Sequence, residues 1–298
     1  MPEYEFMIIR ASALRNGGWT LCLVALVILT AGIKIPVFAQ DRATGSTVSE
    51  LTPRQREIER QRSRMQSSDA EERRDAIMKL GSMRHPDSSR VAAIGLADAI
   101  PIIRATAAGT VLALPREEAV GLLLPLLKDK KEFVRQQVAY ALGHVGSSTA
   151  VADLITTLVR DKQPGVRAAA AVALGLIADD IASGPLARVL DPGFRLSVNA
   201  GVDNKQKREE NTFVQRAAAR ALGQIRSRAS VPALILAMHN KHTTNDVRRE
   251  IAYSLGLIGD MAAVPVLRET LSASDPYLAR NAYEALLKLS PSDATMHP

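Results

Sequence analysis

The sequence predicts an all-α protein, a right-handed α-solenoid of about seven stacked helix pairs. Three observations lead to this class. A phrase of about ten residues recurs along the chain at intervals of about thirty residues, which is typical of stacked helical repeats. Within each copy the apolar residues follow the period of a helix. No stretch alternates between apolar and polar residues with the period of two of a half-buried strand, so we expect no sheet.

The recurring phrase is clearest in four copies, which read VRQQVAYALG, VRAAAAVALG, VQRAAARALG and VRREIAYSLG at residues 134–143, 166–175, 214–223 and 247–256. We take the leucine of the closing Leu-Gly pair as an anchor for comparing copies. The anchors are Leu80, Val111, Leu142, Leu174, Leu222, Leu255 and Leu286. Successive anchors are 31, 31, 32, 48, 33 and 31 residues apart, so one step contains an insertion.

The phrase itself predicts one helix of each pair. Six of the seven residues that stand eight before the anchor are apolar, and most of those three before it are alanine. These offsets place the side chains on one helical face, which must be buried. The alanines allow a neighbouring helix to approach closely.

A second helix is predicted between successive anchors, for example AVGLLLPLL at 119–127 and AVPVLRETL at 263–271. Pro115 with the acidic residues after it suits a first turn, and Asp275-Pro276 suits an N-cap followed by the first helical residue. Each helix pair alone would leave an apolar stripe in water, and stacking of the pairs covers that stripe.

The detailed motif suggests a family. AVPVL at 263–267 and SVPAL at 230–234 open the second helix, and Asp129 and Asp161 each stand five residues before a Val-Arg pair. Over about residues 69–289 this pattern resembles the HEAT-repeat family, and within it the short repeats of the phycobilisome lyase-like group. The resemblance implies a solenoid of HEAT-like helix pairs. It implies no particular activity, because such repeats serve many unrelated adaptors.

A charged column runs through the repeats. Five of the seven residues that stand seven before the anchor are arginine: Arg73, Arg104, Arg135, Arg167 and Arg248. Three of these are preceded, six residues earlier, by Asp98, Asp129 and Asp161. The resemblance implies a structural ladder in which these side chains tie adjacent units together and hydrogen-bond the loops between helices. An anion-binding stripe is the alternative interpretation.

Residues 1–39 have the pattern of a secretory signal peptide. Basic residues precede an apolar run of about 13 residues from Leu21 to Ile33, and small residues precede a cleavage point near Ala39–Gln40. We therefore expect export to the periplasm or the cell exterior, with an uncleaved membrane anchor as the alternative. The only cysteine, Cys22, lies inside the apolar run, so the mature chain would hold no disulfide.

The remaining segments lie outside the regular repeat. For residues 40–68 we expect a disordered lead-in followed by a charged capping helix that opens at Thr52-Pro53. Residues 290–298 are expected to form a loose tail. The insertion at about 191–212 is expected to be a loop, either a plain one or a recognition loop, in which case Phe194 and Leu196 are the residues to test.

Charge and aromatic content limit the choice of partner. The chain carries 38 basic and 31 acidic residues, a net charge of +7. This mild excess is spread along the chain, unlike the dense basic stripe of a nucleic-acid binder, so we expect no nucleic-acid partner. An acidic protein or peptide would suit it, and an anionic envelope polymer or lipid is an alternative. Membrane contact is expected only if the signal segment is retained.

A partner-binding strip is predicted on the phrase-bearing helices, which line the concave face of HEAT-like solenoids. Their residues directed away from the core stand two before or two after the anchor. Taken from the middle and C-terminal repeats, this strip comprises Tyr140, His144, Val172, Leu176, Arg220, Tyr253 and Leu257. Exposed apolar groups gathered on a groove favour a protein or peptide site. Burial of the same columns by the curvature of the solenoid is the alternative.

Catalytic motifs are not found in the sequence. His239 and His242 lie three residues apart without a carboxylate pair at ligand spacing, and there is no glycine-rich phosphate loop or nucleophile motif. We therefore expect no catalytic residue, metal or cofactor. The resulting hypothesis is an exported, monomeric scaffold or adaptor that binds a protein or peptide. The alternatives are an enzyme or chaperone of the lyase or hydroxylase type and a binder of anionic polymer or lipid.

Overall fold

The computed structural model describes residues 51–191 and 211–291. The chain divides into two units, Met1–Glu50 and Leu51–Pro298, and the described residues all belong to the second. The proposed signal peptide, the lead-in up to residue 50, Phe194 and Leu196 of the insertion, and residues 292–298 of the tail lie outside the described residues. Within the described residues all regular structure is helical, so the prediction of an all-α solenoid is confirmed.

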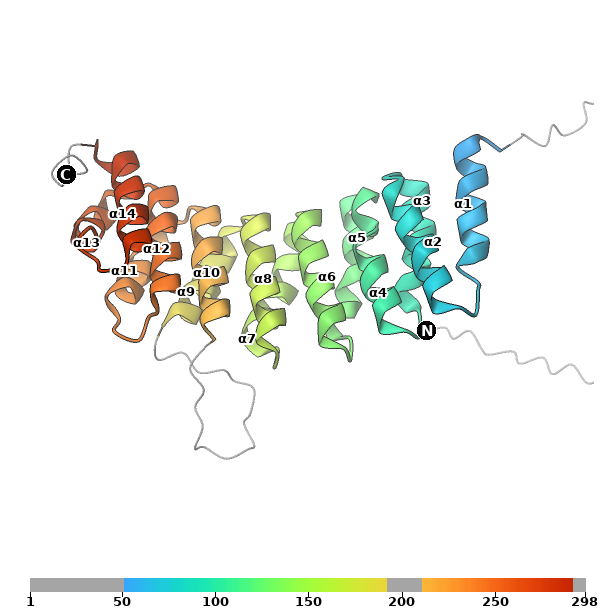
Figure 1. The fold of residues 1–298 in the computed structure, drawn as a ribbon, viewed down its shortest axis with the longest axis horizontal. Helices are drawn as coiled ribbons and strands as arrows, with labels where there is room; N and C mark the ends of the chain where they lie inside the picture. Colours follow the sequence, from blue (N-terminus) through green and yellow to red (C-terminus); the bar gives the residue numbers. More distant parts are fainter. Residues whose placement is uncertain (1–50, 192–210, 292–298) are drawn as a thin grey trace, which may run out of the picture. The chain divides into compact units, whose positions relative to one another are not determined.

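The helices of the second unit alternate between two rows (Figure 1). The phrase-bearing helices, which we call B helices, form one row: α2 (Ala70–Ser82), α4 (Pro101–Ala108), α6 (Glu132–Val145), α8 (Pro164–Ile177), α10 (Thr212–Ile225), α12 (Asn245–Ile258) and α14 (Pro276–Leu289). The intervening A helices form the other: α3 (Pro86–Ala92), α5 (Arg116–Leu123), α7 (Val151–Arg160), α9 (Ser183–Leu190), α11 (Val231–His239) and α13 (Val264–Thr270). Helix α1 (Pro53–Arg64) packs on α2 and α3.

Short 3-10 helices complete the A row at its turns: η1 (Ala93–Ala97), η2 (Val111–Ala113), η3 (Leu124–Lys128), η4 (Ser148–Ala150), η5 (Asp180–Ala182), η6 (Arg228–Ser230) and η7 (Met261–Ala263). Pro125 explains η3, because its missing N–H breaks the α-helical hydrogen-bond pattern after Leu124. The described residues of the second unit form seven helix pairs when α1 is counted as the partner of α2.

The capping signals of the sequence act as expected at several helix ends. The Asp275 side chain accepts hydrogen bonds from the backbone N–H groups of Tyr277 and Leu278, and Pro276 occupies the first turn of α14. Thr52 and Gln55 form a reciprocal capping box at the start of α1. At the other end, α6 and α12 stop at Gly146 and Gly259, which adopt the left-handed conformation that glycine tolerates without strain.

Neighbouring B helices lie unusually close together because small residues face each other. The glycine after the anchor meets the residue before the anchor of the next B helix. A Cβ atom placed on Gly143 would lie 2.7 Å from the Cα atom of Ala173, and one on Gly223 would lie 2.8 Å from that of Ser254. The anchors themselves are fully buried. The core is thus one continuous layer between the two rows.

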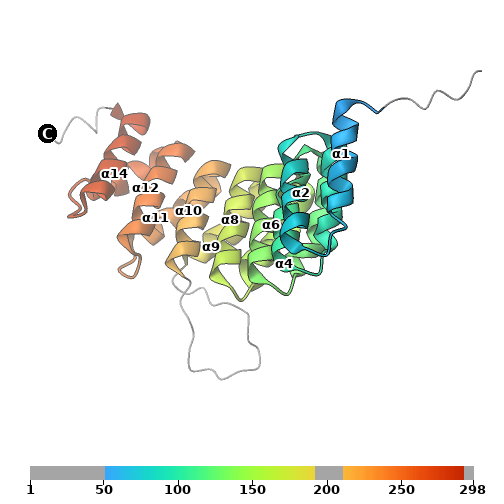
Figure 2. The same ribbon diagram turned by 45° about the vertical axis from the view of Figure 1, so that its right-hand side comes forward.

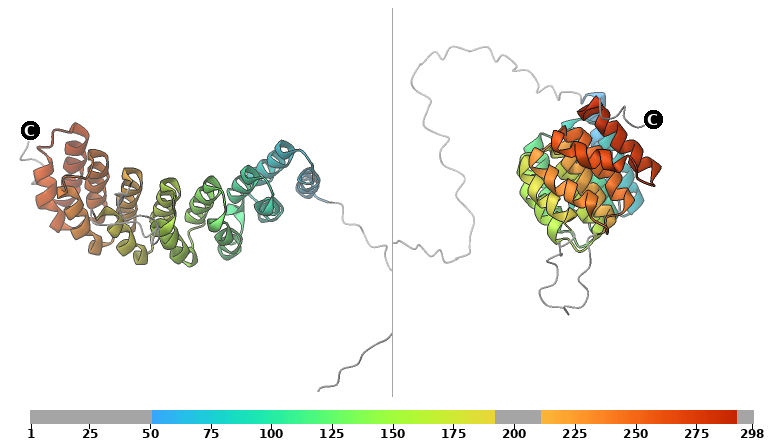
Figure 3. Two further views of the ribbon diagram at one scale, coloured as in Figure 1. Left: turned by 90° about the horizontal axis from the view of Figure 1, so that it is seen from below. Right: turned by 90° about the vertical axis from the view of Figure 1, so that its left-hand side faces the viewer.

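Within this unit the row of helices curves gently, and the B helices lie on the inner side of the curve (Figures 2 and 3). The B helices begin at the lower edge of Figure 1, where α9 ends and α10 starts on either side of the insertion. The prediction that the phrase-bearing helices line the concave face therefore agrees with the arrangement of the second unit.

Candidate functional site

The recurring arginine and aspartate side chains of the repeat form ion pairs between successive units. The Arg104 guanidinium donates through Nε to Asp129 Oδ2 at 2.7 Å and through Nη2 to Asp129 Oδ1 at 2.9 Å. Its third nitrogen, Nη1, donates to the backbone carbonyl of Asp98 at 2.8 Å. One arginine therefore holds the loop of its own unit and the carboxylate of the next unit.

The same pairing recurs in the N-terminal half of the solenoid. Arg73 binds Asp98, and Arg135 binds Asp161, each through two nitrogens. The aspartates also accept a hydrogen bond from the backbone N–H two residues later, as Asp129 does from Lys131. Arg167 donates to the Asp161 carbonyl at 2.8 Å. The structure thus brings together the predicted ladder residues from Arg73 to Arg167.

The ladder changes between the last two units, where Arg248 lies on α12 and Ala273 precedes α14. Arg248 donates to the Asn240 carbonyl at 2.9 Å, but its Nε is buried and has no hydrogen-bond partner among the described residues. Ala273 stands thirteen before its anchor, the position that Asp98, Asp129 and Asp161 hold in their units. The adjacent Arg249 binds Asp275 instead, with Nη2 at 2.5 Å from Oδ2. The pairing therefore moves by one residue on α12.

These contacts shift the pKa values of five ladder groups in the N-terminal half. The hydrogen bond from Arg73 lowers the pKa of Asp98, although partial burial opposes the change. Burial raises the pKa of Asp129, but the hydrogen bonds from Arg104 and the Lys131 backbone outweigh it, so the pKa of that carboxyl is also lowered. The pKa values of Arg73, Arg104 and Arg135 are raised, chiefly by the hydrogen bonds to their carboxylates. The ion pairs hold the ladder in its charged form.

The predicted strip on the B helices is only partly accessible. His144 and Arg220 are exposed and Leu176 is 41% exposed, whereas Tyr140, Val172, Tyr253 and Leu257 are half-buried. Tyr140 packs against the core. Arg220 and Lys288 lie over the Tyr253 ring, with Arg220 Cζ 5.4 Å from its centroid. The strip is therefore less apolar at its surface than the sequence suggests.

A second row of exposed side chains, not predicted from the sequence, lies about two to three turns nearer the start of the B helices. These residues stand nine before the anchor, in the first turn of their helices. We call them the first-turn row: Ile102 is 40% exposed, Phe133 39%, Phe213 52% and Tyr277 66%. The signal in the sequence was a bulky apolar residue in this column in four of the seven copies.

The aromatic residues of the described part of the chain share one location. All six lie on B helices: Phe133, Tyr140, Phe213, Tyr253, Tyr277 and Tyr283. None of the six is fully buried. The core is instead built from leucine, valine, isoleucine and alanine. Five of the six rings stand nine or two residues before their anchors and so share one face of the B helices, whereas Tyr283 occupies the alanine column of α14. A face on which partly exposed rings gather is a candidate binding surface.

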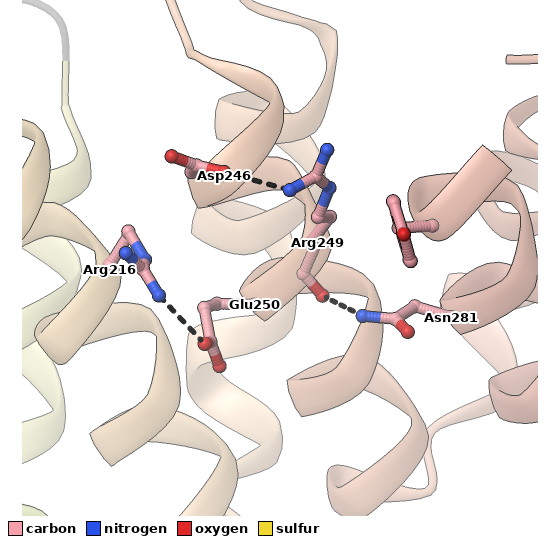
Figure 4. A pocket seen from close by; sticks show the side chains of 6 residues that line it. Arg216, Asp246, Arg249, Glu250 and Asn281 are labelled. Carbon is pink, nitrogen blue, oxygen red and sulfur yellow. Dashed lines mark hydrogen bonds and ion pairs between the residues drawn. The ribbon is translucent and has the colours of Figure 1, made fainter. Parts of the chain in front are cut away.

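A shallow cavity of about 300 Å³ lies between α10, α12 and α14 at the C-terminal end of the row (Figure 4). It is lined by Arg216, Asp246, Arg249, Glu250, Tyr277 and Asn281. The two guanidinium groups balance the two carboxylates, and Arg249 Cζ lies 5.2 Å from the Tyr277 ring centroid. The Asn281 amide nitrogen donates to the Arg249 carbonyl at 3.0 Å. Its amide oxygen therefore remains available as an acceptor, and the neutral, polar lining suits a peptide group.

A metal site and a membrane-spanning helix are two further features to consider for residues 51–191 and 211–291. In that part of the chain no three histidine, cysteine, aspartate or glutamate side chains are grouped so that they could hold a metal ion. His239 lies 3.9 Å from Glu269, on the neighbouring A helix, rather than in such a group. The same residues contain no helix with the length and apolar character needed to cross a bilayer.

Comparisons with solved structures give the fold. The YibA protein of E. coli is 18% identical, with a TM-score of 0.52, covering 78% of this chain and 81% of that chain. The complex of CpcE and CpcF of phycocyanin lyase from Nostoc sp. is 22% identical, with a TM-score of 0.46, covering 85% and 94%. Human deoxyhypusine hydroxylase is 17% identical, with a TM-score of 0.38, covering 78% and 96%.

Comparison of the sequence with curated proteins gave no match. The family model for HEAT repeats matches residues 91–175, 134–193 and 206–288, which together make up more than half of the chain. These matched segments contain most or all of each helix from α4 to α14, six of the seven buried anchors and most of the arginine ladder described above. The chain therefore belongs to the HEAT-repeat family.

Proposed function

We propose that this protein is an exported scaffold or adaptor that binds a protein or peptide partner on its B-helix face and performs no catalysis itself. The observation that carries the proposal is the placement of every aromatic residue of the described chain on the B helices. Aromatic side chains dominate the binding energy of protein interfaces, and a face that concentrates them is suited to a partner.

The geometry of the B-helix face supports the same function. The face runs along the whole row of stacked repeats and offers rows of partly exposed side chains rather than one deep pocket. Repeat proteins use such extended inner surfaces to bind elongated partners. The cavity between α10, α12 and α14 is open and neutral in sum, which suits recognition of a polar main chain.

Export is proposed from the sequence of residues 1–39 alone. The apolar run from Leu21 to Ile33 is shorter than the roughly 20 residues that span a bilayer. We expect the secreted chain to begin at Gln40. N-terminal sequencing of the protein recovered from cell fractions checks this, and an intact N-terminus in the membrane fraction would support the retained anchor instead.

Site-specific photo-crosslinking tests the binding face. A photoreactive residue is placed at Leu176 or Phe213 on the B-helix face, or at Leu236 on α11, which is 62% exposed on the A row. We expect crosslinked protein adducts from the two B-helix positions and none from Leu236. Equal adducts from both rows, or none from any position, would contradict the proposal.

A further inference from the structure

The loops that lead from the A helices into the B helices carry unpaired positive charge. Three of these loops, with the last residues of the A helices before them, expose six basic side chains: Lys128, Lys130, Lys131, Arg160, Lys162 and Lys241. The ladder carboxylates on the same loops, Asp129 and Asp161, are already bound by arginines. Exposed acids close to these loops are Glu132, Asp246 and Glu269; Asp246 pairs with Arg249, and Glu269 lies 3.9 Å from His239.

The opposite edge of the solenoid has a different balance. Its loops, which lead from the B helices into the next A helices, and the A-row residues close to them include six acidic residues and five basic ones, the acids being Asp87, Glu117, Glu118, Asp179, Asp180 and Asp260. The basic residues there are Arg84, Arg90, Arg116, Arg226 and Arg228, of which Arg90 pairs with Asp87 and Glu118. The positive charge therefore gathers on the edge at which the B helices begin.

The first-turn row borders this basic edge, because its residues lie in the first turns of the B helices. Phe133 comes two residues after Lys131. The apolar side chains lie on α4, α6, α10 and α14 and the basic loops precede α6, α8 and α12, so both kinds of group occur along the same edge. A partner that follows this edge meets both kinds of group.

The spacing of the row fits an extended chain. Packed helices lie about 10 Å apart, so Phe133 on α6, Phe213 on α10 and Tyr277 on α14 are each about 20 Å from the next along the row. An extended polypeptide advances about 3.3 Å per residue, so six of its residues cover that distance. Residues six apart in an extended chain point to the same side.

Building on the proposed function, we propose that the partner segment is an extended acidic polypeptide whose apolar side chains, about six residues apart, contact the first-turn row. Its carboxylates face the six loop cations. Its main chain crosses the cavity beside Asn281, whose amide oxygen accepts a hydrogen bond from a peptide N–H. A phosphate polymer or anionic lipid surface would use the lysines but leave the spaced aromatic row without a role.

Fluorescence anisotropy with synthetic peptides tests this inference on the full chain. The probe peptide carries phenylalanine at every sixth position in a glutamate- and serine-rich background, and its control has the same composition with the phenylalanines adjacent. We expect the spaced peptide to bind at least about tenfold more tightly than the control.

The double variant Phe213→Ala, Tyr277→Ala should lose about tenfold in affinity for the spaced peptide. The double variant Lys130→Ser, Lys162→Ser should bind it more weakly, with a smaller salt dependence. Leu236→Ala and Arg228→Ser, on the other row and the other edge, should leave binding unchanged.

Two competitors separate the alternatives. If inorganic polyphosphate or phosphatidylglycerol vesicles bind as tightly as the spaced peptide, and the aromatic double variant binds all of them normally, the site recognises charge alone and the inference is wrong. Absence of peptide binding also overturns it. Crosslinked adducts from Leu176 and Phe213 would, in that case, still leave the proposed function standing with a partner of other chemistry.

Discussion

At the scale of the residue, the ladder arginines combine two kinds of contact in one side chain. Arg104 closes the loop of its own unit through a backbone carbonyl and joins the next unit through Asp129. The aspartate in turn accepts from the backbone N–H of Lys131. Because every polar group of this cluster has a partner, partial burial of the ion pair is not a net cost, but removal of one member would leave the other unsatisfied.

Acid should weaken the solenoid through these carboxylates. The pKa values of Asp98 and Asp129 are lower in the folded chain than in the unfolded chain, so the stability they contribute is complete above the unfolded value of about 3.9 and is lost as the pH falls through the folded value. We expect the urea midpoint to fall between pH 5 and pH 3. The double variant Asp98→Asn, Asp129→Asn should start lower and fall less, and an equal fall in both proteins would contradict the assignment.

Among the described residues Arg248 lacks the carboxylate partner that the ladder arginines from Arg73 to Arg135 have, and supplying one should stabilise the protein. Ala273→Asp places a carboxylate at the position that faces the arginine in the intact rungs, so it should supply an acceptor to the buried Nε of Arg248. We expect a stabilisation of about 1 kcal/mol in chemical unfolding. Ser274→Asp, which adds the same charge one residue later, is the matched control and should change the unfolding free energy by much less.

At the scale of the element, the distance between B helices is set by the small residues around the anchor. Gly143 and Gly223 each face the Cα atom of a residue on the next helix, where a methyl group has no room. The backbones therefore approach until their main-chain atoms touch. This close approach explains why the Leu-Gly ending varies less among the copies of the repeat than the residues at exposed positions do.

Adding one methyl group should test that packing. Gly143→Ala should destabilise the protein by about 1–3 kcal/mol, because the new Cβ meets backbone atoms of α8 that cannot rotate away. Gly121→Ala, in a helix of the A row with no atom within 4 Å of the new methyl, should stabilise it by about 0.5–1 kcal/mol through helix propensity. Thermal and urea unfolding measure both, and a neutral Gly143→Ala would show that the helices can separate at low cost.

At the scale of the whole described unit, each helix pair contacts chiefly its neighbours. Stability in such an array is the sum of weak units and strong interfaces. The terminal helices α1 and α14 have a neighbour on one side only within residues 51–191 and 211–291. Tyr283 and Leu287 occupy the alanine and glycine columns of the last repeat and remain partly exposed there.

Local opening should therefore be graded along the row. In native-state hydrogen exchange followed by mass spectrometry, we expect the slowest exchange in α6, α8 and α10 and the fastest in α1 and α14, since end units lack one stabilising interface. Uniform protection along the unit would indicate that it opens as a single cooperative body instead.

The solenoid, its buried columns and the residues of the ladder could be predicted from the chain alone, because side chains that are buried at regular intervals recur at regular intervals in the sequence. The repeat pattern alone predicts the anchors, the small residues beside them and the recurring Asp and Arg residues. The residues of the candidate site could be read only in part. The residues of the first-turn row stand at one repeated position in the sequence, but the sequence does not show that their side chains are exposed.

Which of these side chains are accessible, and which of them pair, depends on how the repeats pack and is seen only in the folded chain. Tyr253 was expected on an open strip, yet Arg220 and Lys288, each more than thirty residues away in sequence, lie over its ring. Arg104 binds the carboxylate of Asp129, 25 residues ahead, and contacts Asp98, six residues behind it, through the backbone carbonyl. The exposure and the pairing of a side chain depend on the neighbouring repeat. The position of that repeat is set by helix packing and cannot be inferred from the residues of a single copy.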